Sequence, residues 1–167
     1  KGLIMRKSLI VTAIAALALL VPSASVGATP PLDLEIENPL TFTGTPNGEL
    51  SGTGPFSATG AAVDSGVVCG SGTNLMIAWS QSGYQPGNDW VNYHVVHEFT
   101  CDDGSGSFYI QLQVRVDQKG DNFNWVIKGG TGDYEQLHGS GKGIGLAPGP
   151  QDTFNVLDLY SGQAHSK

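Results

Sequence analysis

The sequence has little positive charge. Of its 167 residues, eight are Lys or Arg and 15 are Asp or Glu, so the formal net charge is −7. Without Lys1, Arg6 and Lys7, which belong to a predicted leader, the charge falls to about −10. An acidic surface repels nucleic acid and anionic lipid, so neither is an expected partner.

Common catalytic and nucleotide-binding motifs are also missing. The chain has no Gly-x-Ser-x-Gly elbow and no His-Glu-x-x-His pair. Its glycine-rich stretch 128–143 contains Gly141-Lys142, but Gly143 follows where a phosphate-binding loop needs Ser or Thr. Glu135 stands where a dinucleotide fingerprint needs its third glycine. We therefore expect no nucleotide cofactor.

Cysteine is scarce, since the sequence holds only Cys69 and Cys101. Two thiols in a secreted chain usually pair. A zinc site is the alternative, but neither residue lies in a Cys-x-x-Cys motif, and two sulfurs alone make a poor site. We expect a disulfide between the two cysteines and no metal.

Residues 1–28 resemble a secretory signal peptide preceded by a few upstream residues. A basic pair comes before an apolar run from Leu9 to Val21, and small residues lead to Ala28. This run has about 13 residues, whereas a membrane-spanning helix needs roughly 20. We therefore expect a secreted protein with one domain over 29–167 and no membrane attachment after cleavage.

The remaining chain lacks helical periodicity, and from residue 69 onward apolar and polar residues alternate in short runs. This pattern predicts half-buried antiparallel strands separated by turns. A two-residue turn at Asp103-Gly104 sets Phe99 opposite Phe108, and all other apolar residues of the two runs pair on the same face.

Two further turns extend this arrangement into a four-stranded meander over 69–129. A bend at Lys119-Gly120 sets Val114 opposite Trp125. A disulfide lying directly across two strands sets Trp79 opposite Val91 and places Thr73 beside His97, with Leu75 and Ile77 also on the buried face. Four further strands are expected outside the meander, over residues 32–43, 55–63, 140–146 and 153–162.

About eight antiparallel strands are enough to form a closed or nearly closed β-barrel, which is the predicted all-β fold. A β-sandwich remains the alternative, because strand number does not separate the two architectures. In a barrel, the stretch 128–143 turns the chain at one end, where Tyr134 and Leu137 plug the opening. Gly139, Gly141 and Gly143 share one face of the next strand and leave room for bulky neighbours.

The runs "IKGGTGDYEQLHGSGKG" and "GSGSFYIQLQVRV", with a terminal "YSG", resemble the barrel superfamily of plant dirigent proteins and allene oxide cyclases, especially small secreted bacterial members. The resemblance covers roughly residues 67–163 and implies an eight-stranded antiparallel barrel, often oligomeric, whose interior accepts hydrophobic ligands. Leu137-His138 departs from the dirigent pattern, and no catalytic residue of the family maps onto this chain.

The expected function is therefore binding of a small apolar ligand or a partner by a secreted barrel, without catalysis and without a cofactor. An isomerase or cyclase that acts on an apolar substrate inside the barrel is the alternative, with His97, Tyr93 or Tyr160 moving a proton. His94 and His97 are three residues apart in a strand and point to opposite faces, so they form no metal clamp. The complete set of candidate ligand-binding residues is Thr73, Trp79, Tyr93, His97, Trp125 and Tyr160.

Overall fold

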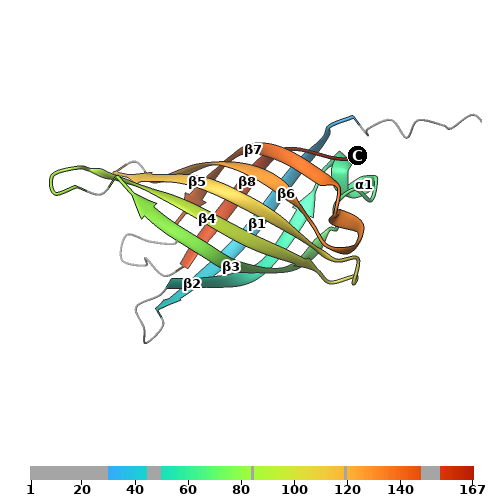
Figure 1. Ribbon diagram of the computed structural model, residues 1–167, viewed down its shortest axis with the longest axis horizontal. Coiled ribbons are helices and arrows are strands. Elements are labelled where there is room, and N and C mark those ends of the chain that lie inside the picture. The colour runs from blue at the N-terminus through green and yellow to red at the C-terminus, as the bar shows by residue number, and fades with distance from the viewer. Residues whose placement is uncertain (1–29, 45–49, 84, 119, 148–154) are drawn as a thin grey trace, which may run out of the picture.

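The alternating pattern folds into eight antiparallel strands that close into one barrel, because β1 pairs with β8 (Figure 1). The computed structural model describes residues 30–44, 50–83, 85–118, 120–147 and 155–167. The predicted leader lies outside these residues. The elements are β1 (Leu32–Gly44), β2 (Leu50–Thr59), α1 (Ala61–Asp64), β3 (Ser71–Ser82), β4 (Trp90–Cys101), β5 (Ser107–Asp117), β6 (Gly120–Gly130), the 3₁₀ turn η1 (Gly132–Tyr134), β7 (Leu137–Leu146) and β8 (Asn155–Ser166).

The barrel confirms the predicted fold and rules out the β-sandwich, since each strand pairs with its sequence neighbour around the ring. The strand expected over 55–63 ends earlier, at Thr59, and the chain then enters α1. Figure 1 shows α1, η1 and the C-terminus at one end of the barrel, which we call the helix end. The β3–β4 and β5–β6 connections lie at the other end, which we call the loop end.

The β4–β5 hairpin has the predicted register. Phe99 lies opposite Phe108, and Val95 lies opposite Leu112. The turn between the strands contains Gly104 with φ +78°, a backbone conformation that glycine adopts without strain. The turn residues and the alternation of apolar and polar side chains were sufficient to predict this register, because each strand presents one clearly apolar face.

The predicted β5–β6 register is wrong by two residues. Val114 lies opposite Phe123 instead of Trp125, and Asp117 pairs with Gly120. The bend therefore falls one residue earlier than Lys119-Gly120. Because side chains alternate with a period of two, this shift keeps the same residues inside the barrel.

The predicted β3–β4 register is wrong in a way that reverses the faces. Gly72 lies opposite Cys101, so Asn74 and Met76 point inward, while Leu75 and Ile77 are 45% and 47% exposed. The register shifts between Met76 and Ala78, which is the mark of a β-bulge. One extra residue returns Trp79 to the inner side, opposite Val95.

Cys69 and Cys101 form the predicted disulfide, with Cα atoms 6.1 Å apart. Cys69 lies two residues before β3 begins, so the bridge ties the α1–β3 connection to the end of β4. The expectation that the two cysteines lie directly opposite each other on neighbouring strands is therefore wrong. The two cysteines are close together as predicted, but a disulfide does not require its residues to be a directly opposed strand pair, so it gave the wrong β3–β4 register.

The inward glycines of β7 give room to large side chains of β6. A Cβ atom added to Gly139 would lie 2.8 Å from Ile127 Cδ1, and one added to Gly141 would lie 2.6 Å from Trp125 Cζ2. Nε1 of Trp125 donates a hydrogen bond to the carbonyl oxygen of Lys142 in β7 (3.0 Å). The predicted space for bulky neighbours is thus filled by the protein itself.

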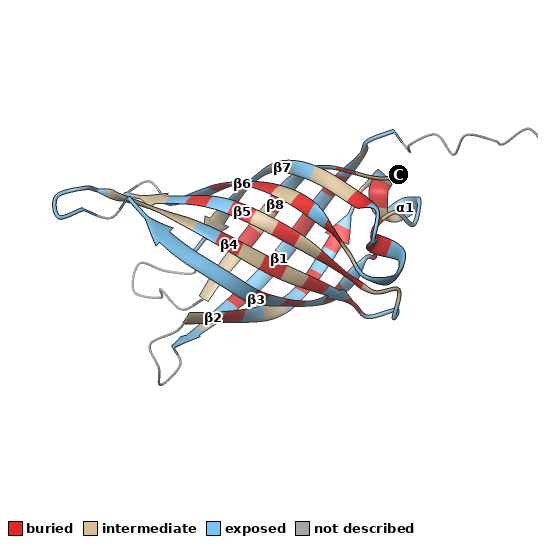
Figure 2. Cartoon of the chain, viewed as in Figure 1, coloured by how far each residue is buried: buried red, intermediate tan, exposed pale blue. Residues whose placement is uncertain are grey.

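Buried residues are concentrated between the helix end and the middle of the barrel (Figure 2), and many of them are aromatic. Phe99 and Phe108 stack with ring centroids 5.1 Å apart, and Phe108 contacts Tyr134 of η1 at 5.5 Å. The hydroxyl of Tyr134 lies 2.7 Å from Ser105 Oγ. Tyr134 and Leu137 are 3% and 1% exposed, so both close this end as predicted.

Candidate functional site

The loop-end half of the barrel contains a cavity of about 250 Å³. Its wall is formed mainly by apolar and aromatic side chains, and one imidazole, one phenol and two carboxyls also line it. A concave site with an apolar wall and a few polar groups is typical of ligand pockets. The lining residues are Phe42, Leu50, Met76, Trp79, Tyr93, Val95, His97, Leu112, Val114, Val116, Asp121, Phe123, Val156 and Asp158.

His97 lines this cavity from the middle of β4 and is 2% exposed, whereas His94 is exposed on the outer face. The opposite directions of the two histidines are confirmed. His97 lies in the middle of β4, in a row that leads through Ile110 and Ile127 to Gly139, and the cavity that it lines extends from it toward the loop end.

The hydrogen-bond partner of His97 is Asn74, whereas Thr73, which was expected beside His97, is exposed on the outer face. Nδ1 of His97 lies 2.7 Å from Asn74 Oδ1. A carbonyl oxygen only accepts, so Nδ1 carries the proton in this pair. Burial lowers the pKa of His97 to about 4, so the ring is neutral near pH 7 and Nε2 is an acceptor.

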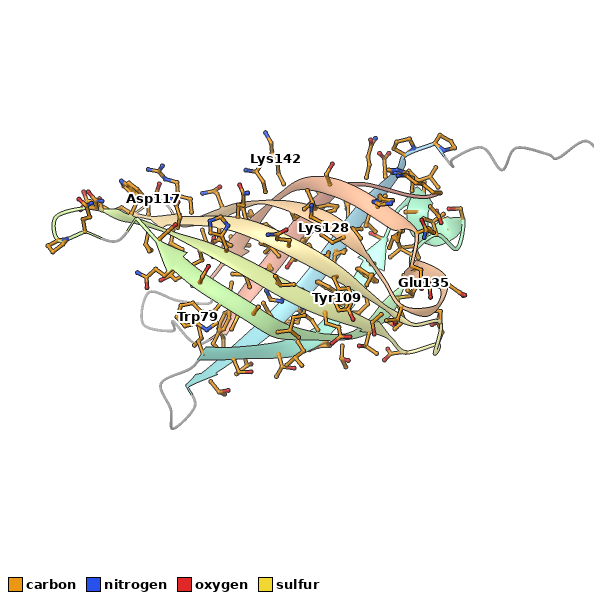
Figure 3. The ribbon with its side chains drawn as sticks, in the orientation of Figure 1. Trp79, Tyr109, Asp117, Lys128, Glu135 and Lys142 are labelled. Carbon is orange, nitrogen blue, oxygen red and sulfur yellow. A yellow bond between two sulfur atoms is a disulfide. The ribbon has the colours of Figure 1, made fainter. Side chains whose placement is uncertain are left out.

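Trp79 and Tyr93 form the aromatic part of the cavity wall, with ring centroids 6.3 Å apart. Trp79 is 38% exposed, so it lies between the cavity and solvent. Figure 3 shows Trp79 toward the loop end of the barrel. Its position depends on the β3 bulge, because without the extra residue it would point outward.

Two candidate ligand-binding residues, Trp125 and Tyr160, belong to the packed core. Their rings are 6.2 Å apart, they are 1% and 2% exposed, and neither lines the cavity. Burial raises the pKa of Tyr160 well above its usual range. The structure therefore brings together Trp79, Tyr93 and His97 of the predicted set.

Sequence reasoning missed the two carboxyl groups that line the cavity, Asp121 of β6 and Asp158 of β8. Burial raises the pKa of Asp121 to about 6. Burial, and secondarily the nearby Asp121 charge, raise the pKa of Asp158 to about 8. Strand alternation could have identified them: Asp121 lies two residues from Phe123, and Asp158 lies two residues from Tyr160, so each carboxyl points to the same inner face as its aromatic neighbour.

A larger hollow of about 730 Å³ lies on the outer face over β5–β8 and β1. Exposed side chains of both charge signs line it, including Glu35, Arg115 and Lys142. Figure 3 shows Lys142 pointing away from the barrel. We take the inner cavity as the site, because it combines a buried imidazole and two carboxyls of raised pKa with an apolar wall.

The cavity has the groups needed for hydrogen bonding and proton transfer. Near pH 7 it holds a neutral imidazole, His97, and a carboxyl with a pKa of about 8, Asp158. Within the described ranges, no group of three or more His, Cys, Asp or Glu side chains is arranged to hold a metal ion. No helix in that part of the chain is long and apolar enough to cross a membrane.

Comparison with known proteins leaves the family open. No protein-family model, no curated protein and no solved structure matches this chain.

Proposed function

We propose that this chain is a secreted, non-catalytic barrel that binds a small apolar molecule in its inner cavity. The observation that carries the proposal is the division of the barrel interior. Aromatic side chains pack the helix-end half, while the loop-end half leaves about 250 Å³ empty behind an apolar wall. Burying apolar ligand surface there provides roughly 25 cal/mol per Å² before the cost of ordering the ligand.

Secretion and a relationship to the dirigent and allene oxide cyclase superfamily are parts of this proposal. The Cys69–Cys101 disulfide supports an oxidising compartment. The eight-stranded antiparallel barrel supports the family resemblance, although a fold does not determine an activity. A homo-oligomer also stays a prediction, which light scattering on the purified protein would test.

Calorimetric titration with naphthylmethanol, an uncharged apolar probe, tests cavity binding. Val114→Phe places a larger side chain into the cavity wall and should abolish binding. Val96→Phe makes the same change on the outer face of β4 and should leave binding intact. Equal binding by both variants would contradict the proposal.

A second candidate function is an isomerase or cyclase that acts on an apolar substrate in the same cavity. The observation that favours it is that the same cavity wall holds neutral His97 and Asp158, whose raised pKa of about 8 keeps it protonated near neutral pH. Tyr93 also lines the cavity, whereas Tyr160 does not. Asp158→Asn should then stop conversion of a molecule that co-purifies with the protein, as followed by mass spectrometry.

A further inference from the structure

Two carboxyl groups approach each other across a glycine on the cavity wall. In the strand register, Asp121 of β6 lies opposite Gly145 of β7, and Gly145 lies opposite Asp158 of β8. A Cβ atom added to Gly145 would lie 2.8 Å from Asp121 Oδ2. Asp121 therefore extends over β7 toward Asp158, into space that any side chain at position 145 would occupy.

No described cation balances this pair. Lys and Arg are absent from the described residues that line the cavity. Arg115 of the neighbouring strand β5 is on the outer face, where its Nε lies 3.5 Å from Asp117 and its guanidinium lies 5.1 Å from the Trp90 ring centroid. His97, which also lines the cavity, is neutral because burial lowers its pKa to about 4.

Hydrogen-bond acceptors without donors gather in the same row of residues. Asp121 Oδ1 is buried and has no hydrogen-bond partner. Asn38 lies directly opposite Asp158 in the β1–β8 register and is fully buried. Its Nδ2 donates to the carbonyl oxygen of Pro55 (2.8 Å), but its Oδ1 has no partner. Buried polar atoms are normally satisfied, so these two oxygens leave room for further donors besides the Asp158 proton and the hydroxyl of Tyr160.

We propose that the apolar ligand carries an amine, whose ammonium group binds at Asp121 and Asp158 while its hydrocarbon part lies against Trp79, Tyr93 and Leu112. This inference rests on the proposed binding function and names the ligand class. An ammonium group supplies several N–H donors and the missing positive charge together.

The protonation of the pair suits a single positive charge. With pKa values of about 6 for Asp121 and about 8 for Asp158, the pair carries roughly one negative charge near pH 7. The other titratable groups nearby are Tyr160 beside Asp158, and Tyr93 and His97 on the cavity wall. Near pH 5 both carboxyls hold protons, so the preference for an amine should disappear.

The test compares three probes with the same ring system by calorimetry: naphthylmethylamine, naphthylmethanol and naphthoate. At about pH 8 the amine should bind about tenfold more tightly than the alcohol, which corresponds to about 1.4 kcal/mol. Naphthoate should bind more weakly than the alcohol. At about pH 5 the amine and the alcohol should bind equally.

Asp121→Asn should remove the advantage of the amine, so that the amine and the alcohol bind this variant with similar affinity. Glu37→Gln removes one negative charge from the outer face of β1 and should keep the advantage. Retained alcohol binding shows that each variant is folded. An alcohol that binds as tightly as the amine, or an Asp121→Asn variant that still prefers the amine, overturns the inference while cavity binding stands. Failure of all three probes to bind refutes the proposed function itself.

Discussion

Replacing Gly141 with Ala tests whether the Trp125 side chain of β6 needs the space that glycine leaves on β7. The new Cβ atom would lie 2.6 Å from Trp125 Cζ2 and 2.7 Å from Gly162 Cα, and it would also clash with the carbonyl oxygen of Ser161. Two of these three neighbours are main-chain atoms of β8, so no side-chain rotation relieves the contact. Relief requires β7 and β8 to separate or the Trp125 ring to leave its position.

Overpacking a well-packed interior costs typically 1–3 kcal/mol, and main-chain clashes place Gly141→Ala at the upper end, about 3 kcal/mol. Unfolding entropy near 2.1 cal/mol/K per residue gives about 0.3 kcal/mol/K for a domain of this size. The melting temperature should therefore fall by about 10 °C. Circular dichroism during heating, with urea unfolding as a second measurement, provides the assay.

Two matched glycine variants make the result specific. Gly44→Ala adds its Cβ where no atom lies within 4 Å and should change stability by less than about 0.5 kcal/mol. The three atoms nearest to a Cβ at Gly145 all belong to the Asp121 side chain, the first at 2.8 Å, and this side chain can move, so the cost of Gly145→Ala should fall between the other two. If Gly141→Ala melts within about 2 °C of the wild type, the close β6–β7–β8 packing is refuted.

Unfolded, unreduced protein should show no free thiol, and replacing Cys69 and Cys101 with Ser should cost about 3–4 kcal/mol for a loop with a sequence separation of 32; two titratable thiols per chain would contradict the disulfide. Because the folded pKa of Asp158 is raised from 3.8 to about 8, its contribution to stability is fully present below about pH 4 and is lost as the pH rises through 8. Asp158→Asn should flatten this decline, on the order of 5 kcal/mol, in urea unfolding series; an unchanged slope would count against a protonated Asp158. The NMR ring signals of His97 should stay constant from about pH 8 to pH 5 and shift only near pH 4, and a midpoint above 6 would show that the ring is not buried. Calorimetry with ATP should detect no saturable binding, and binding that Lys142→Ala abolishes would reopen the phosphate-loop interpretation.

Strand number and the β4–β5 hairpin could be predicted because one face of each strand is apolar and the turn contains a glycine. The same reasoning failed on β3, where the face with Leu75 and Ile77 looked like the buried one. Asn74 faces inward instead, and its hydrogen bond with His97 satisfies its buried side-chain oxygen. Hydrophobicity alone does not reveal that a polar residue has a buried partner 23 positions away along the chain.

The candidate site was only partly predictable for the same reason. Trp79, Tyr93 and His97 were identified as aromatic or titratable residues on expected strand faces. Asp121 and Asp158 were missed, because isolated acidic residues normally indicate solvent exposure. Their burial becomes evident only when β6, β7 and β8 lie side by side, with Gly145 between the two carboxyls.

The sequence by itself determined an all-β chain of about eight strands, a Cys69–Cys101 bridge and a glycine-rich stretch that does not match a phosphate loop, because alternation, cysteine number and motif spacing are local properties. Only the tertiary structure decided the direction in which β3 faces, the extent of core packing and the position of the cavity. A single bulge at Ile77 changes which β3 side chains face inward. The pairing of β1 with β8 then places Asn38 opposite Asp158, although 120 positions separate them in the sequence. These features depend on strand register around a closed ring, which is fixed by contacts between residues far apart in the chain.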